Sequence, residues 1–279
     1  MDTEAIKQFL NDVHQRHKDY DYTKVKSVLQ ELKRGFVATN KQDEAKEVWC
    51  YEQTINAQKN FMEAYKALKQ EKFYEAWCIL EKCEIALLYL KPHFYQRFSE
   101  YSLDFIENHA RMLQSLYPYK LFISPEMLIH HYKCSICDQR VVLRNPCRHE
   151  VGEIYNGEMC VRIIDGIEFL GSAFVTNPVQ KYSVPFLTDQ QTGKTVDPYN
   201  YNLVKFLIEK LSTPFDDWSL KWTKKLHPHS KFKHLSRNDK CPCASGKKYK
   251  QCCLNKKGVL MDHCIFSIPG IEGCEERIL

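Results

Sequence analysis

Long apolar runs are missing from this chain of 279 residues. A membrane-spanning helix needs about 20 consecutive apolar residues, and no stretch of the sequence approaches that length. The first residues also lack the basic segment and apolar core of a secretory signal. We therefore expect a cytoplasmic protein with no membrane span.

The chain also lacks the short length and disulfide-dense composition of a small secreted scaffold, although it contains 13 cysteines. Its composition is 44% hydrophobic and 27% charged, as expected of a folded soluble protein. In a reducing compartment, closely spaced cysteines are first interpreted as metal ligands. Eight cysteines form two such groups: Cys134, Cys137, Cys147 and Cys160, then Cys241, Cys243, Cys252 and Cys253.

Acidic residues are almost absent from one segment. Residues 221–257 contain twelve Lys or Arg and one acid, Asp239, for a net charge of +11. Because the whole chain carries +5, the remainder carries −6. A basic segment on a mildly acidic body predicts an anionic partner, such as an acidic protein surface, the ribosome or nucleic acid.

The first part of the chain, residues 1–122, has the apolar spacing of helices. Residues 44–90 resemble a tetratricopeptide-type helical hairpin with its turn at 70–72, but a second copy at the 34-residue period is missing. We expect one further helix at 94–116, after Pro92.

The character of the sequence changes after residue 122, and we expect an α+β multidomain protein. Short β-rich runs at 140–143, 152–155, 159–164 and 169–176 predict a small zinc-associated β unit over residues 123–198, with a loop at 184–196. A helix and basic linker follow at 199–234, then a metal module at 235–257. The tail, 258–279, shows little pattern, and we expect it to be ordered only in part.

The module at 235–257 places four cysteines at C-x-C-x8-C-C spacing: Cys241, Cys243, Cys252 and Cys253. With the flanking Arg237-Asn238-Asp239, Ser245-Gly246 and Lys247-Lys248-Tyr249, this stretch resembles the SEC-C motif, the zinc module at the C-terminal end of the SecA translocation ATPase. The likeness covers about 18 residues. Nothing else in the chain resembles the SecA motor.

Four thiolates around zinc form a closed tetrahedral site with no position left for a reacting water. So short a segment has too little apolar surface to fold by burial, so the metal must supply the folding free energy. The sequence departs from the family at Lys240, where Pro is usual, and at Ala244, where Gly is usual. If that turn needs a positive φ, Ala244 strains it slightly.

A second candidate site has the spacing C-x2-C-x9-C-x-H, formed by Cys134, Cys137, Cys147 and His149. Two short pairs of N and S donors can complete one tetrahedron, as in zinc knuckles and ribbons. Cys160 could replace His149 as the fourth ligand. The tripeptide Gly193-Lys194-Thr195, by contrast, ends like a phosphate-binding loop but lacks the required earlier glycine, since Thr188 stands there.

The resemblance implies a bacterial, zinc-binding adaptor, because the SEC-C module of this family docks onto other proteins and is not catalytic. Two alternatives remain open. One is a hydrolase or protease centred on residues 134–184, with the module for targeting. The other is a nucleic-acid-binding protein in which Trp218, Trp222, Phe232 and Tyr249, interleaved with lysines, stack on bases.

Overall fold

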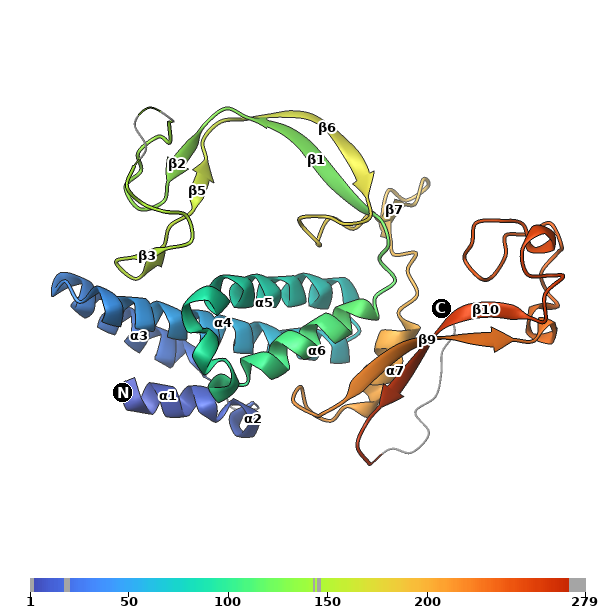
Figure 1. The fold of residues 1–279 in the computed structure, drawn as a ribbon, viewed down its shortest axis with the longest axis horizontal. Coiled ribbons are helices and arrows are strands. Elements are labelled where there is room, and N and C mark those ends of the chain that lie inside the picture. Colours follow the sequence, from blue (N-terminus) through green and yellow to red (C-terminus); the bar gives the residue numbers. More distant parts are fainter. Residues whose placement is uncertain (1–2, 18–20, 143, 145–146, 271–279) are drawn as a thin grey trace. The chain divides into compact units, whose positions relative to one another are not determined.

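The computed structural model describes residues 3–17, 21–142, 144 and 147–270. It confirms the α+β class, and the chain separates into two compact units, residues 1–201 and 202–279. Figure 1 shows the helices, the small sheets and the order of the elements. Among the described helices, none has the length and apolar character needed to cross a bilayer.

Helices make up the first part of unit one: α1 Thr3–Asn11, α2 Val13–Arg16, α3 Tyr22–Ala38, α4 Gln42–Lys69, α5 Phe73–Phe94 and α6 Leu103–Ser115. The antiparallel pair α4 and α5 forms the centre of the core, where Tyr51, Ile55 and Leu80 are fully or almost fully buried. Their turn is closed by Glu71 at a φ of 57°. Buried Gln58 donates to the carbonyl oxygens of Leu10 and Tyr101, so α4 also holds α1 and the segment before α6.

After the helices come short strands: β1 Phe122–Ile129, β2 Tyr132–Cys134, β3 Ile154–Tyr155, β4 Glu158–Met159, β5 Arg162–Ile164, β6 Ile167–Val175, β7 Leu187–Thr188 and β8 Thr195–Val196. They pair antiparallel in twos, β1 with β6, β2 with β5, β3 with β4 and β7 with β8. The long β1–β6 ribbon therefore carries the β2–β5 pair and the β3–β4 hairpin at its far end (Figure 1).

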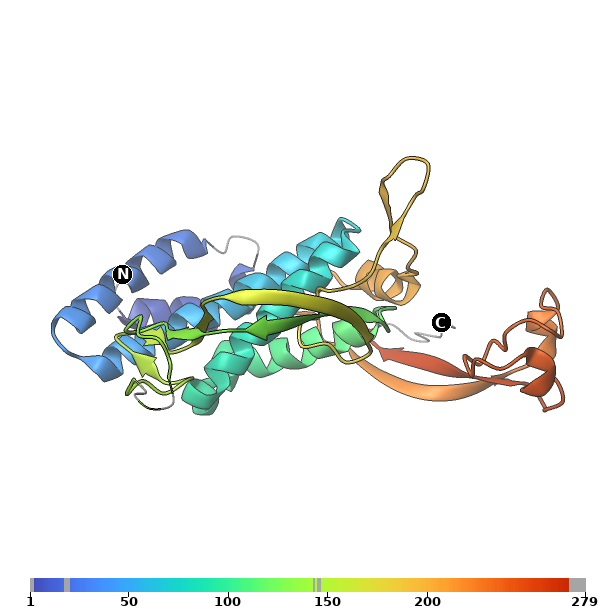
Figure 2. The ribbon, with the colours of Figure 1, turned by 90° about the horizontal axis from the view of Figure 1, so that it is seen from above.

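Both ends of the ribbon are fastened to the helices. Near its base, Trp77 of α5 donates to the carbonyl oxygen of Lys181, and Glu81 accepts from the amide of the same residue. At the far end, the Lys33 Nζ lies 2.7 Å from both Glu52 and Glu158, and also donates to the Gly157 carbonyl. Figure 2, seen from above, shows the ribbon running along the helices between these points.

Unit two contains α7 Asn202–Lys210, β9 Ser219–His227 and β10 Val259–Ser267, with 3-10 turns at His229–Phe232 and Tyr249–Gln251. Strands β9 and β10 pair over their full length, from His227 opposite Val259 to Ser219 opposite Ser267. Phe266 packs against Phe206 of α7, whereas Val259 and Met261 join a second small core at the other end of the ribbon.

The structure corrects several local predictions. The tail forms strand β10 over nine residues, and the basic linker forms its partner β9. The expected strand at 140–143 is reduced to one bridge, at Arg140; residue 143 lies outside the described part. The predicted helix at 94–116 begins only at Leu103, because two 3-10 turns precede it. Residues 187–188 and 195–196, predicted as loop, form a hairpin.

Candidate metal centres

The C-terminal cysteines lie on two loops that backbone hydrogen bonds hold together. The amide of Cys241 donates to the Lys247 carbonyl, and that of Tyr249 donates to the Asp239 carbonyl. The turn between Cys243 and Gly246 needs left-handed backbone at Ala244, whose φ is 59°. An alanine therefore occupies a conformation that glycine adopts more readily, so the condition under which slight strain was expected at Ala244 is met.

The four sulfurs of these loops lie close together. The Sγ atoms of Cys241 and Cys243 are 3.3 Å apart, those of Cys243 and Cys252 are 3.4 Å apart, and those of Cys252 and Cys253 are 3.7 Å apart. All four lie within 4.8 Å of one another. Sulfurs bound about 2.3 Å from a tetrahedral zinc would lie about 3.8 Å apart, so this group could hold a metal ion of that kind.

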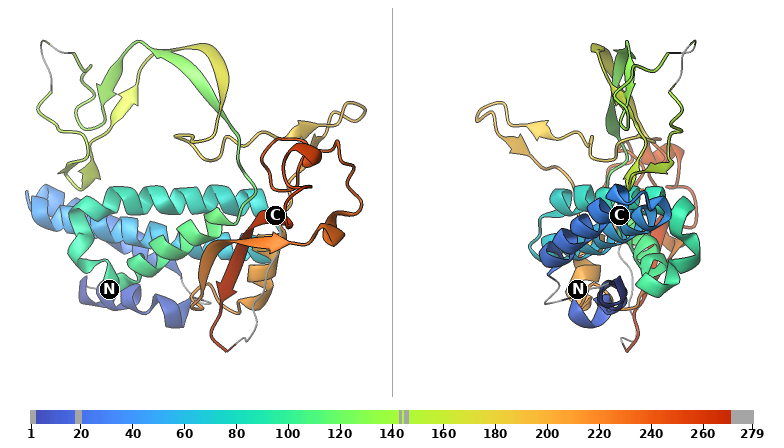
Figure 3. Two further views of the ribbon diagram at one scale, coloured as in Figure 1. Left: turned by 45° about the vertical axis from the view of Figure 1, so that its right-hand side comes forward. Right: turned by 90° about the vertical axis from the view of Figure 1, so that its left-hand side faces the viewer.

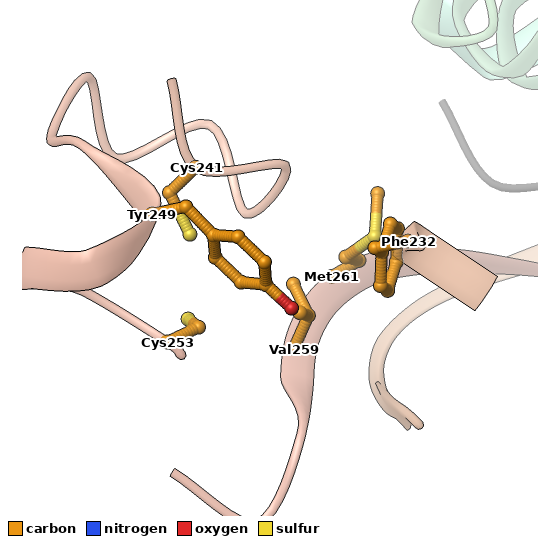
Figure 4. Close-up of a cluster of buried hydrophobic side chains, with 6 residues drawn as sticks. All are labelled: Phe232, Cys241, Tyr249, Cys253, Val259 and Met261. Carbon is orange, nitrogen blue, oxygen red and sulfur yellow. The ribbon is translucent and has the colours of Figure 1, made fainter. Parts of the chain in front are cut away.

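The sulfurs also form part of the local hydrophobic core. Figure 4 shows the Tyr249 ring between the cysteine side chains and Val259 of β10. The buried members of this core are Phe232, Cys241, Tyr249, Cys253, Val259 and Met261. His229 connects Tyr249 to the segment after the cysteines. Its Nδ1 lies 2.5 Å from the Tyr249 hydroxyl, and its Nε2 lies 2.8 Å from the Lys256 carbonyl oxygen. The residues that could hold a metal are thus also residues of this small core.

Protonation differs among these thiols. Burial opposes ionisation of Cys243, but the Ser245 hydroxyl and neighbouring thiols offset it and bring its pKa to about 6. Burial and the adjacent thiols raise the pKa of Cys253 to about 12. One sulfur is therefore ready as a thiolate at neutral pH, whereas a cation is needed to keep several ionised side by side.

Exposed cations without ion-pair partners are concentrated in unit two, which contains this module. Ten exposed Lys or Arg side chains of unit two form no ion pair with any described residue. They are Lys221, Lys224, Lys231, Lys233, Arg237, Lys240, Lys247, Lys248, Lys256 and Lys257. In unit one, by contrast, Lys33, Lys91, Arg97 and Lys181 all pair with glutamates.

The central group is also assembled in space. The ligand atoms of Cys134, Cys137, Cys147 and His149 all lie within 4.8 Å of one another, so this group too could hold a metal ion. Strand β2 ends at Cys134, and a tight turn follows, in which Asp138 donates its amide to the Cys134 carbonyl. Burial opposes ionisation of Cys134, but the amides of Cys137 and Ile136 donate to its sulfur and bring its pKa to about 6.

His149 fits a ligand role better than Cys160 does. Its Nδ1 is buried and has no hydrogen-bond partner among the described residues, which a bound cation would explain. The Cys160 sulfur is fully buried and lies 3.8 Å from that of Cys134, but it is not a member of the four-atom group. The residues present therefore suit a borderline-soft cation held by three sulfurs and one nitrogen.

The aromatic residues of the basic segment are mostly unavailable for stacking. Trp218, Phe232 and Tyr249 are buried, and Trp222 alone of the four is exposed, at 38%. Their interpretation as a base-stacking set is wrong for three members, because these three rings are buried, Phe232 and Tyr249 of them in the small core around the cysteines. Sequence reasoning missed His229, whose only signal was its place just before the module.

A family model described as the SEC-C motif matches residues 237–255. This confirms the resemblance inferred from the cysteine spacing. No curated protein and no solved structure matches the chain.

Proposed function

We propose that this protein, whose residues 237–255 match the SEC-C motif, is a zinc-binding adaptor that docks onto an anionic protein surface through unit two. One observation carries the proposal: unit two contains ten exposed cations that form no ion pair with a described residue, together with a group of four cysteines that could hold a metal. Unpaired charge of one sign attracts a partner of the opposite sign and speeds association. An acidic chaperone or a ribosomal protein has this chemistry.

Zinc is the metal we assign to Cys241, Cys243, Cys252 and Cys253, and a second zinc to Cys134, Cys137, Cys147 and His149. Both donor sets contain four sulfur or nitrogen ligands, the number that closes a tetrahedral structural site. In the first site, zinc would hold the two loops that display Lys247 and Lys248. In the second, it would hold the hairpin that contacts Lys33.

The same four-donor sets argue against the hydrolase alternative, because a catalytic zinc keeps one position for water or substrate. With no catalytic role assigned to either metal site, we assign the function to the basic surface of unit two. Nucleic acid is the weaker partner class, since Trp222 alone of the four aromatics is available to stack on a base.

A pull-down from cell extract tests the docking surface. The bait is the intact chain, compared with Lys247→Glu, Lys248→Glu and with a matched control, Lys24→Glu, Lys120→Glu, which reverses two exposed lysines of unit one. We expect the first variant to lose an acidic protein that the wild type and the control retain. Added salt should release the same protein from the wild type. Identical partners for all three baits, or a partner that nuclease treatment removes, would contradict the proposal.

A further inference from the structure

The β1–β6 ribbon has one strongly apolar face. Cross-strand partners in an antiparallel pair lie on the same face, and the register pairs Ile123 with Phe174 and Met127 with Phe169. Alternation along β1, together with the bulge in the pairing between Glu126 and Met127, places these residues on that face: Ile123, Pro125, Met127, Ile129, Ile167, Phe169, Ser172 and Phe174. Phe169 and Phe174 are 66% and 67% exposed, so unit one leaves much of this face uncovered.

A second apolar surface lies on α5, between the two points where the ribbon is fastened. Near the ribbon base, Glu84 of α5 pairs with Lys181, and nine residues later His93 Nε2 lies 2.8 Å from the Gly152 carbonyl oxygen. The helix between them spans about 14 Å. It displays Ile85, Leu88 and Tyr89, which are 44%, 67% and 44% exposed. Figure 3 shows the ribbon above this part of α5 in two views.

Two hollows join these surfaces. One, of about 350 Å³, is lined by Ile85, Leu87 and Leu88 of α5 and by Val179. The other, of about 220 Å³, is lined by Ile123, Pro125 and Met127 of the ribbon, and again by Val179. Val179 is 99% exposed and borders both. We call the ribbon face, the exposed α5 residues and the two hollows the apolar cleft.

The charges at the rim of the apolar cleft neutralise one another. Glu107 pairs with Lys91 at 2.7 Å and with Arg111 at 2.6 Å, and Lys181 pairs with Glu84. Because three cations and the glutamates Glu81, Glu84 and Glu107 line the larger hollow, its formal charge is zero. A complementary occupant therefore brings apolar side chains and no net charge, unlike the partner of unit two.

We propose that the apolar cleft binds an uncharged, apolar segment of another polypeptide chain. In the described residues β1 and β6 pair as strands only with each other, so each strand has an outer edge of backbone N–H and C=O groups, of which the Ile123 amide donates to the Ser183 carbonyl. A peptide backbone can satisfy such groups, whereas an acyl chain cannot. Two-stranded ribbons are only marginally stable in water, so covering the apolar face also stabilises the ribbon. The cleft lies wholly within unit one and does not depend on the docking proposed for unit two.

Fluorescence anisotropy of a labelled dodecapeptide that alternates leucine and serine tests this site on the whole 279-residue chain, loaded with zinc. We expect saturable binding, with roughly tenfold weaker affinity for Leu88→Asp and for Phe169→Asp. Both side chains are largely exposed, so the variants should fold, and thermal unfolding verifies that. Leu226→Asp, a 51% exposed leucine of β9, is the matched control and should bind like the wild type.

Two further measurements distinguish peptide binding in the apolar cleft from peptide binding at unit two and from the binding of acyl chains. Cys252→Ser, Cys253→Ser should leave peptide binding unchanged; if binding is lost, it belongs to unit two and the proposal is wrong. Laurate should displace the peptide poorly, and equal competition would make the cleft an acyl-chain site. Wild-type affinity in both aspartate variants, or equal binding of a peptide that alternates aspartate and serine, would also overturn the proposal.

Discussion

Ala244 holds a backbone conformation that L-residues other than Asn and Asp rarely adopt, at a φ of 59° between Cys243 and Cys252 of the C-terminal cysteine group. Replacing Ala244 with glycine should relieve this strain. The extra conformational freedom of glycine in the unfolded chain should offset part of the gain in stability. We expect Ala244→Gly to stabilise unit two by about 1 kcal/mol. Urea unfolding of the zinc-loaded protein measures this. Ala38→Gly, at the end of α3, is the control and should be destabilising; equal effects of both changes would show that Ala244 is unstrained.

His227 is 1% exposed, and its Nε2 has no partner among the described residues. Burial lowers its pKa below the usual 6.5, and nearby Lys231, Lys225 and His263 lower it further. The folded protein thus keeps this ring neutral while the unfolded chain gains a proton below pH 6.5. The contribution of neutral His227 to the unfolding free energy should therefore be fully present above pH 6.5 and should be lost progressively as the pH falls below that value.

A His227→Gln variant tests this assignment. Its unfolding free energy should change less than that of the wild type between pH 7.5 and pH 5.5, about one unit to either side of the ordinary pKa of histidine. Metal loss at the lower pH affects both proteins, so the difference between them isolates the histidine. Parallel pH profiles would show that His227 does not titrate as described.

At the scale of elements, Lys33 is one of the side chains that connect the β3–β4 hairpin to the helices, beside His93 and Gln42. Lys33 of α3 is 14% exposed and contacts Glu52 of α4 and Glu158 of β4. Its aliphatic carbons also occupy the space where a Cβ at Gly157 would lie. Burial raises the pKa of Glu52, and Lys33 opposes that rise.

Lys33→Ala leaves the Glu52 carboxylate, 13% exposed, without its cation. We expect a loss of about 1–3 kcal/mol in the unfolding free energy. Hydrogen exchange should also quicken in residues 152–160, which the contact holds against the helices. Lys24→Ala, at an exposed position of the same helix, should change neither measurement. Unchanged exchange in the first variant would mean that other contacts hold the hairpin.

Sequence patterns predicted the helical hairpin and both cysteine groups because each depends on local spacing. The α4–α5 turn lies at the expected 70–72, and the members of each candidate metal group are close neighbours in sequence. Strand β10 was missed for a physical reason. Val259 and Met261 are buried with the SEC-C core, whereas Cys264 and Phe266 are buried from the opposite face. The change of buried face along one strand removes the simple alternation that identifies strands.

The spacing of residues in the sequence also could not decide whether His149 or Cys160 is the fourth member of the central group. Both lie within reach of Cys134 in sequence, and only the fold shows that the histidine shares the compact group. The apolar cleft was equally hidden, because Leu88 and Phe169 come from a helix and a strand about 80 residues apart.

On the scale of the whole molecule, the two units carry proposed docking surfaces of opposite character. Unit two presents exposed cations and a cysteine group that could hold a metal, and unit one presents a neutral apolar cleft beside a ribbon that carries a second such group. An adaptor needs two such separate surfaces to join different partners. Removing the metals should therefore weaken the charged surface directly and the cleft through its fastening.

Native mass spectrometry of the purified protein, with elemental analysis to identify the metal, tests the central claim most directly. We predict two zinc ions in the intact chain, one in Cys252→Ser, Cys253→Ser, and one in Cys137→Ser, Cys147→Ser. A wild-type protein that contains no transition metal after purification in zinc-supplemented buffer would contradict the claim, because the four C-terminal thiols could not then organise the surface on which the proposed docking depends.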